Sequence, residues 1–307
     1  VILWVVFFSL ILLEHMINFQ FTVEAGIIAG TAIFFYGTID EKSKWANAET
    51  LIVILFIWIS FCIRMNVLLM AVPFGGLVFL SKEAEVKRKL IAGIIVVTGL
   101  AGILAFEHRA YAGEDWQNYM DYNEYRSMVY DYYGVPPYGE NQEFYDSIGM
   151  KEYDVVNLER YNLYFIDGLE EGKMQQVAEY AKSQYLEQHS LKERIKMGIR
   201  VAGKAELNSE TMMLNILAKL CILLNLFYGV RKKKKGGWIN IGFLLCEAVL
   251  IWSLGFEGRL PVRVMTALLM IELASGATIF YQEHWEAPGL EQSTGVKRLS
   301  VVLTLLL

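Results

Sequence analysis

The chain of 307 residues contains few cysteines, prolines and histidines: three, five and four, respectively. Cys62, Cys221 and Cys246 all lie within apolar runs, which excludes a disulfide framework and a cysteine-based zinc site. No two histidines share a predicted helix at ligand spacing, and there is no Gly-rich nucleotide-phosphate loop, zinc-protease or serine-hydrolase motif. We therefore expect no resident zinc, no ATP-driven chemistry and no nucleic-acid partner.

Hydrophobic residues, by contrast, make up 55% of the chain and gather in long blocks such as Leu51–Ile63 and Leu90–Phe106. A soluble protein distributes its apolar residues in short periodic runs. The segment 107–209 differs from the rest, because it holds 19 acidic and 11 basic residues, a balance of −8 against +3 elsewhere, and 14 of the 17 tyrosines. The distribution predicts an all-α, polytopic membrane protein with one water-exposed insertion.

Nine apolar segments are candidate membrane spans, since a helix needs about 20 apolar residues to cross the hydrocarbon core. Arg64-Met65-Asn66 interrupts the run 51–80, so we predict two short helices with a tight turn there. About five spans fall in 1–106 and about four in 210–307; the first and last are short, and we expect sequence beyond both ends. The candidates are Val1–Leu13, Ile17–Tyr36, Leu51–Ile63, Val67–Leu80, Leu90–Phe106, Met212–Val230, Ile239–Phe256, Val262–Tyr281 and Val296–Leu307.

Lysine and arginine in short loops set the orientation of such proteins. Ser81–Lys89 carries four basic residues and Arg231–Lys235 is basic throughout, which places both loops in the cytoplasm. The acidic segment 107–209 then lies on the extracytoplasmic side of the plasma membrane.

Helical periodicity and glycine stop signals divide this insertion into short helices. Its last helix, Leu191–Val201, alternates basic and apolar residues as helices at a membrane interface do. The tyrosines suit partly buried surfaces, and they also suit a surface that stacks on sugar rings. The four preceding helices are expected at Glu114–Tyr133, Asn141–Ile148, Glu152–Ile166 and Glu170–Gln188.

Ionisable residues inside spans are costly and therefore candidates for function. Glu24, Lys219, Glu247 and Glu272 are of this kind. Lys219 is the only cation near the centre of a span, so we expect it to pair with Glu247 or Glu272. Such a pair fits either a structural contact that fixes helix register or a path for protons or ions.

Charged residues also gather at the expected outer edge of the membrane. Arg64, Arg259 and Arg263 are candidates for binding a lipid-linked phosphate, because the guanidinium group matches phosphate geometry. Glu14 or Asp115 would act as general base on a sugar hydroxyl or help hold a divalent cation against a pyrophosphate. The alternative is that these arginines simply extend toward lipid headgroups.

The aromatic block Trp116-x-x-Tyr119-x-x-Tyr122-Asn123-x-x-Arg126 is similar to insertions in uncharacterised multi-pass proteins of Gram-positive anaerobic bacteria. The span layout as a whole resembles polyprenyl-phosphate-dependent membrane glycosyltransferases and polysaccharide polymerases. That resemblance implies glycosyl transfer from or to a polyprenyl-linked carrier during cell-surface glycan assembly. Two other functions stay open: a transporter or flippase with a coupling site at Lys219, and a non-enzymatic sensor or assembly subunit.

Overall fold

The computed structural model describes residues 19–82, 84–232, 236–256 and 258–284. Across these ranges the chain forms helices joined by turns, with no strand. Six of the helices are long and apolar enough to cross a membrane. The chain is therefore an all-α, multi-pass membrane protein, as the sequence predicts. The predicted spans Val1–Leu13 and Val296–Leu307 lie outside the described residues.

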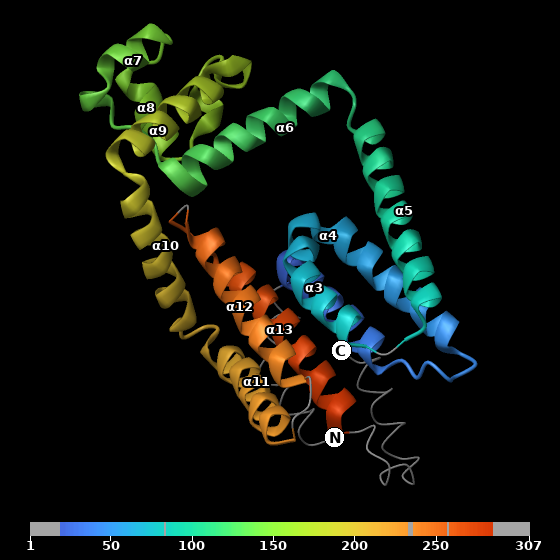
Figure 1. The fold of residues 1–307 in the computed structure, drawn as a ribbon. Coiled ribbons are helices and arrows are strands. Elements are labelled where there is room, and N and C mark those ends of the chain that lie inside the picture. The colour runs from blue at the N-terminus through green and yellow to red at the C-terminus, as the bar shows by residue number, and fades with distance from the viewer. Residues whose placement is uncertain (1–18, 83, 233–235, 257, 285–307) are drawn as a thin grey trace. The chain divides into compact units, whose positions relative to one another are not determined.

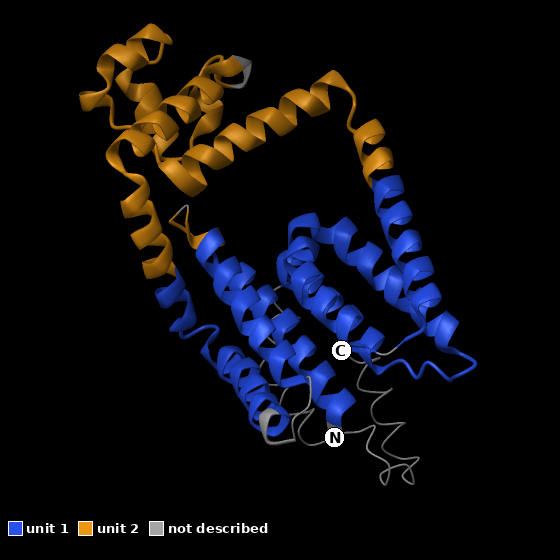
Figure 2. Cartoon of the chain, in the orientation of Figure 1, with its two compact units in different colours: residues 1–103, 202–253, 260–307 blue, residues 104–201, 254–259 orange. Residues whose placement is uncertain are grey.

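The chain divides into two compact units (Figure 2). The first, called the membrane unit here, comprises residues 1–103, 202–253 and 260–307. The second, the tyrosine-rich unit, comprises residues 104–201 and 254–259. It therefore combines most of the predicted insertion with a short segment from the turn that follows residue 253.

Long helices make up the membrane unit (Figure 1). Their ends fall within a few residues of the apolar runs, because each run stops at a charged or glycine-containing turn. They are α3 (Phe21–Thr38), α4 (Ala46–Ser81), α5 (Val86–Ala110), α11 (Met212–Lys232), α12 (Gly236–Gly255) and α13 (Val262–His284).

Helix α4 is a hairpin of two helices. Arg64 has an extended backbone (φ −158°, ψ 96°) and breaks the helix at its middle. A straight helix of 36 residues would be about 54 Å long. Instead, Lys82 just beyond its end lies 3.1 Å from the carboxylate of Glu41, a few residues before its start. The predicted pair of short helices with a turn at Arg64 is thus confirmed.

Helices α3 and α13 approach each other closely through small residues. A Cβ atom at Gly26 would lie 2.7 Å from the Cβ atom of Ala267, and one at Gly30 would lie 3.1 Å from that of Ala274. Glycines four residues apart on one face allow such contact between membrane helices. Because the backbones meet here, α3 has a fixed register against α13.

Short helices form the tyrosine-rich unit, and two of its segments are π-helical. Glycines with positive φ end two of the helices, Gly134 at 79° and Gly149 at 68°, as the predicted stop signals require. The helices are α6 (Glu114–Ser127), π-helical Met128–Tyr133, α7 (Gln142–Ser147), α8 (Glu152–Glu159), π-helical Leu169–Lys173, α9 (Met174–Gln188) and α10 (Leu191–Glu206); α10 continues from this unit into the membrane unit.

One predicted helix of this unit, Glu152–Ile166, is too long. The helix ends at Glu159, and Tyr161 adopts a left-handed conformation with φ 62°. The amide of Asn162 donates to the carbonyl of Asn157 at 2.8 Å, a capping bond that closes the last turn. Tyr161 is held there because its ring packs on Tyr130, with 4.5 Å between centroids.

Tyrosines supply much of the packing in the core of this unit. Tyr145 is fully buried and donates its hydroxyl to the carbonyl of Pro136 at 2.6 Å. Tyr130 donates in the same way to the carbonyl of Leu158 at 2.5 Å. Burial raises the pKa of Tyr130 to about 12, and it raises the pKa of Tyr145 further. These phenols are neutral, hydrogen-bonded parts of the core.

Candidate functional site

Three charged side chains meet inside the membrane unit. Lys219 of α11 contacts Glu247 of α12 and lies 2.9 Å from the carboxylate of Glu272 on α13. Both carboxylates are buried, with side-chain exposures of 5% and 0%, whereas the lysine side chain is 27% exposed. The sequence predicted one of these two partners for Lys219, and the structure brings both to it. We call these three residues the charged triad.

The charged triad has an odd charge balance. One ammonium group faces two carboxylates, which leaves one negative charge in excess when all three groups are ionised. A buried, uncompensated charge is expensive in a medium of low polarity. One further positive charge, either a proton or a bound cation, would make the triad neutral.

A buried amide pair follows the charged triad along the same three helices. Asn225 of α11 donates its amide to the carbonyl of Gly276 on α13 at 2.8 Å and to the side chain of Asn240 on α12 at 3.3 Å. Asn240 in turn donates to the carbonyl of Gly236 at 2.7 Å. The two bonds of Asn225 reach α12 and α13, so this amide joins the three helices, whereas the bond of Asn240 to Gly236 lies within α12.

Carboxylates mark both ends of this row of polar groups. At one end, the amide of Asn215 donates to the side chain of Glu206 at 2.8 Å. At the other, the backbone amide of Gly236 donates to the carboxylate of Glu283 at 2.9 Å. The row thus runs from the start of α11 to the end of α13. We call it the polar row; it consists of Glu206, Asn215, Lys219, Glu247, Glu272, Asn225, Asn240 and Glu283.

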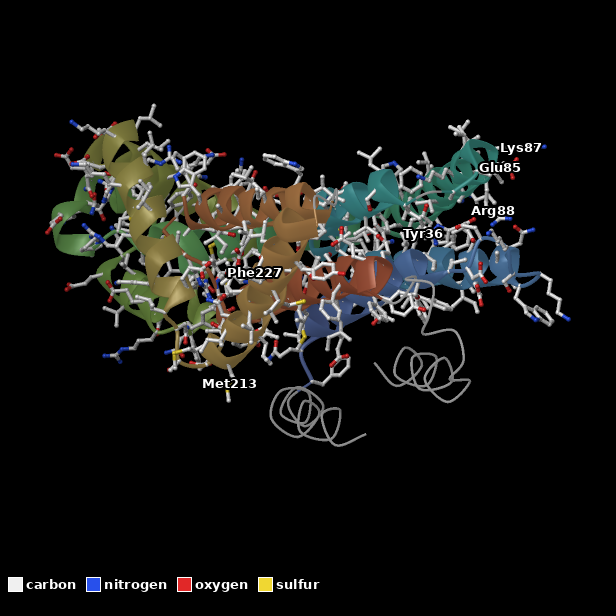
Figure 3. The ribbon with its side chains drawn as sticks, turned by 60° about the horizontal axis from the view of Figure 1, so that its bottom comes forward. Tyr36, Glu85, Lys87, Arg88, Met213 and Phe227 are labelled. Atoms are coloured by element: carbon white, nitrogen blue, oxygen red, sulfur yellow. The ribbon has the colours of Figure 1, made fainter. Side chains whose placement is uncertain are left out.

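The polar row extends over a large part of the membrane's thickness. Asn215 and Lys219 are four residues apart on α11, and Glu247 and Gly236 are eleven residues apart on α12. Added together, the two separations amount to about 22 Å along the helix axes. The hydrocarbon core is about 30 Å thick. The outer side of α11 is apolar by contrast: Met213 and Phe227 are 54% and 68% exposed, and Met213 points away from the helix (Figure 3). Polar side chains therefore face the bundle interior over most of a membrane's thickness.

The arginines proposed from the sequence as phosphate ligands have different surroundings. Arg64 is exposed and lies over the ring of Phe21, 5.2 Å from its centroid. Arg263 is exposed near the start of α13. Arg259 belongs to the tyrosine-rich unit, where it forms an exposed ion pair with Asp131. Within the described part of the membrane unit, no hydrogen bond or ion pair joins Arg64 to Arg263.

The remaining predicted site residues are Asp115, Glu24 and Glu14. Asp115 is exposed in the first turn of α6, and Glu24 is half-buried in the first turn of α3. Glu14 lies outside the described residues. Within the described ranges, no group of three or more His, Cys, Asp or Glu side chains is arranged to hold a metal ion.

The tyrosine-rich unit carries a shallow surface depression of about 670 Å³. Its lining combines the rings of Tyr138 and Tyr153 with the polar side chains of Lys151, Glu152 and Asn157. The ammonium of Lys151 pairs with Asp146 at 2.8 Å, a contact that lowers the pKa of the carboxyl and raises that of the lysine. Aromatic faces beside hydrogen-bonding groups suit a sugar ring.

Comparison with protein-family models, with curated proteins and with solved structures gave no match to this chain. Sequence reasoning missed five members of the polar row: Glu206, Asn215, Asn225, Asn240 and Glu283. A signal for two of them was present, because Asn225 lies in the same apolar run as Lys219, and Asn240 lies seven residues, or two helical turns, before Glu247.

Proposed function

We propose that the protein is an ion-coupled transporter or flippase of the plasma membrane. The observation that supports this is the polar row through α11, α12 and α13, with the charged triad within it. Polar and ionisable groups in the membrane interior are found where ions, protons or substrates pass. A purely structural ion pair would need one carboxylate for one lysine, whereas this site has two.

In this proposal the charged triad takes up one proton from water on one side and releases it on the other. Protonation of one carboxylate makes the triad neutral and removes one of the two ion pairs that Lys219 forms. Since these pairs join α11 to α12 and α11 to α13, their strength sets how firmly the three helices hold together. A solute that binds only one arrangement of the helices is thereby coupled to the proton.

The orientation is part of the same proposal. With the basic loops 81–89 and 231–235 in the cytoplasm, the residues 107–209 are extracytoplasmic. The tyrosine-rich unit would then meet solutes or glycans outside the cell before they reach the membrane.

Infrared titration of the full chain in lipid vesicles tests the proton site without knowledge of the solute. We expect the difference between the spectra of the original chain and of Glu272→Gln to contain a protonated-carboxyl stretching band that appears as the pH falls. Glu193→Gln is the matched control, since Glu193 is a carboxylate of α10 outside the polar row. A band of unchanged size in Glu272→Gln and Glu247→Gln contradicts the proposal.

Proton movement tests the coupling. Vesicles that contain the protein and a trapped pH indicator would receive a panel of sugars, amino acids and inorganic phosphate. We expect at least one solute to cause a pH change, and Lys219→Met to abolish it. Lys204→Met, at an exposed lysine of α10, is expected to behave as the original chain does. A solute carried equally well by Lys219→Met would exclude the triad as coupling site.

A second candidate is glycan assembly with a polyprenyl-phosphate carrier. The specific observation in its favour is the aromatic and polar depression of the tyrosine-rich unit, which suits a sugar. In this scheme Arg64, Arg259 and Arg263 bind phosphate, and Glu14 or Asp115 acts as base. Replacement of Arg64 and Arg263 by alanine should abolish glycan product while the protein remains in the membrane. Unchanged product would remove this candidate.

A further inference from the structure

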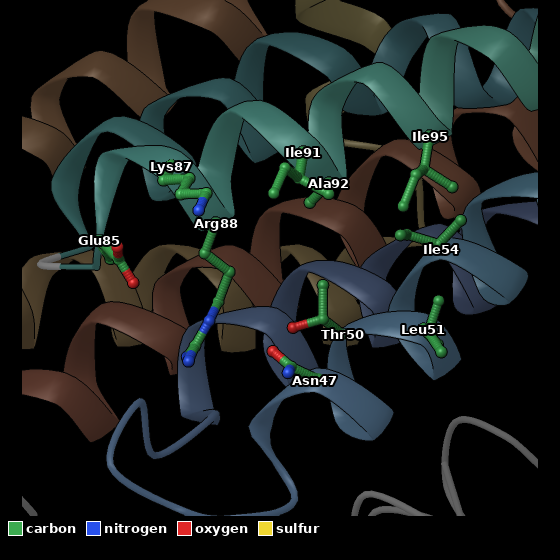
Figure 4. A pocket seen from close by; sticks show the side chains of 10 residues that line it. All are labelled: Asn47, Thr50, Leu51, Ile54, Glu85, Lys87, Arg88, Ile91, Ala92 and Ile95. Carbon is green, nitrogen blue, oxygen red and sulfur yellow. The ribbon is translucent and has the colours of Figure 1, made fainter.

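A groove of about 400 Å³ lies between the first half of α4 and the start of α5 (Figure 4). Helix α5 has no buried residue, although it is 25 residues long and apolar. The groove is therefore a gap between two membrane helices of one unit, open along α5. It has no residue in common with the polar row.

One end of the groove is polar and basic. Lys87 and Arg88 lie next to each other at the start of α5, across from Asn47 on α4, with Glu85 at the edge (Figures 3 and 4). Residues 81–89 carry four basic and two acidic side chains, and Glu41 adds one carboxylate. Residues 81–89 and Glu41 together therefore have a net charge of +1. Glu41 binds Arg88 through Nη1. A guanidinium has five N–H donors, so Arg88 keeps further N–H groups that can donate to a second anion.

The other end of the groove is apolar. Leu51 and Ile54 of α4 face Ile91 and Ile95 of α5 (Figure 4). Beyond them, Trp58 bridges the helices, because its indole N–H donates to the carbonyl of Val96 at 3.3 Å. From Arg88 to Val96 the groove runs about 12 Å along the helix axis. Its basic end lies at the tip of both helices and its apolar end toward their middles.

We infer that this groove binds one anionic phospholipid. The phosphate would lie at Lys87, Arg88 and Asn47, and one acyl chain would lie between the isoleucines as far as Trp58. Basic pockets between membrane helices bind anionic headgroups, and each Lys or Arg contributes to that attraction. A zwitterionic lipid lacks the net charge, and a soluble phosphate lacks the chain for the apolar end. The order of polar and apolar side chains along the groove matches the order of groups along a phospholipid.

Native mass spectrometry of the full chain in detergent tests this inference. The probes are phosphatidylglycerol and phosphatidylcholine with the same acyl chains, and glycerol phosphate as the headgroup alone. We expect one phosphatidylglycerol per chain to be retained at least about fivefold more tightly than phosphatidylcholine, the factor for one basic side chain. Glycerol phosphate should not bind. Equal retention of the two lipids, or binding of glycerol phosphate alone, would overturn the inference.

Two adjacent residues provide a matched pair of variants. Ile95→Trp fills the groove, whereas Ile94→Trp places the same side chain on the exposed side of α5, where Ile94 is 64% exposed. We expect only Ile95→Trp to lose the retained lipid. Lys87→Gln should lower the preference for phosphatidylglycerol about fivefold, and Lys182→Gln, at an exposed lysine of α9, should leave it unchanged. Equal loss in both tryptophan variants contradicts a bound lipid in the groove.

Discussion

The two units bury polar side chains in different ways. The tyrosine-rich unit buries Asn141 and Asp154 as well as phenols, and the phenols of Tyr145 and Tyr130 each donate to one backbone carbonyl. In the membrane unit the buried groups include charges, with one lysine between two glutamates. Each of these phenols has its hydrogen bond and needs no further group, whereas the charged triad has a charge left over.

This difference separates a structural polar group from a candidate functional one. A hydrogen-bonded phenol can be replaced by a phenyl ring at the cost of one hydrogen bond. A charged group in a network cannot be removed without leaving its partners unbalanced. Burial alone therefore does not identify a site; the charge balance of the buried group does.

The largest effect is expected for Lys219→Met. It leaves two buried carboxylates without a cation, which should lower the free energy of unfolding by about 3–5 kcal/mol at neutral pH. Thermal unfolding in detergent measures this, and Glu272→Gln in the same chain should restore part of the loss. A loss below about 1 kcal/mol would place the charged triad in the same class as an exposed ion pair.

Tyr145→Phe should have a smaller effect. It leaves the buried carbonyl of Pro136 without its hydrogen bond, at a cost of about 1–3 kcal/mol. Unfolding followed by near-ultraviolet circular dichroism reports on the tyrosine-rich unit. Tyr164→Phe is the matched control, because Tyr164 is 95% exposed. Equal shifts for both variants would mean that the buried hydroxyl contributes nothing specific.

Alkaline pH should distinguish the phenols further. The pKa of Tyr130 in the folded chain is raised from 10.0 to about 12 by burial. Its stabilisation is therefore fully present below pH 10 and is lost as the pH rises from 10 toward 12. Unfolding at several pH values measures the loss, and Tyr130→Phe should show a weaker pH dependence in this range. If the pH dependence of unfolding is the same in Tyr130→Phe, Tyr130 does not contribute to it.

The smallest effect is expected for Arg259→Ala. Its ion pair with Asp131 is 42% exposed on both sides, and exposed pairs contribute about 0–1 kcal/mol. Thermal unfolding should therefore change little. A loss as large as that of Lys219→Met would show that the exposure of an ion pair does not decide its contribution in this protein.

Much of the fold follows from local sequence. The apolar runs fix the long helices, and Arg64 within one such run indicates the reversal of α4. The end of α8 at Glu159 could not be predicted in this way. The left-handed Tyr161 is favoured by its packing on Tyr130, and that contact depends on residues about thirty positions apart.

The candidate site was only partly predictable. Lys219 has few possible partners among the spans, so its pairing could be expected. The positions of Asn225 and Asn240 relative to Lys219 and Glu247 can be seen in the sequence, but their hydrogen bonds depend on the packing of α11 against α12 and α13. The arginines at 64, 259 and 263 share a depth in the predicted topology, and their role as phosphate ligands stays a prediction.

The hairpin in α4 also has a consequence for counting crossings. A helical hairpin whose two ends lie together crosses the bilayer either twice or not at all. The contacts of Glu41 with Lys82 and Arg88 join the segment before α4 to the one after it. Residues 39–45 therefore lie at the same end of the hairpin as residues 82 and 84–89, and a single accessibility label at Lys42 would assign the sidedness of both segments.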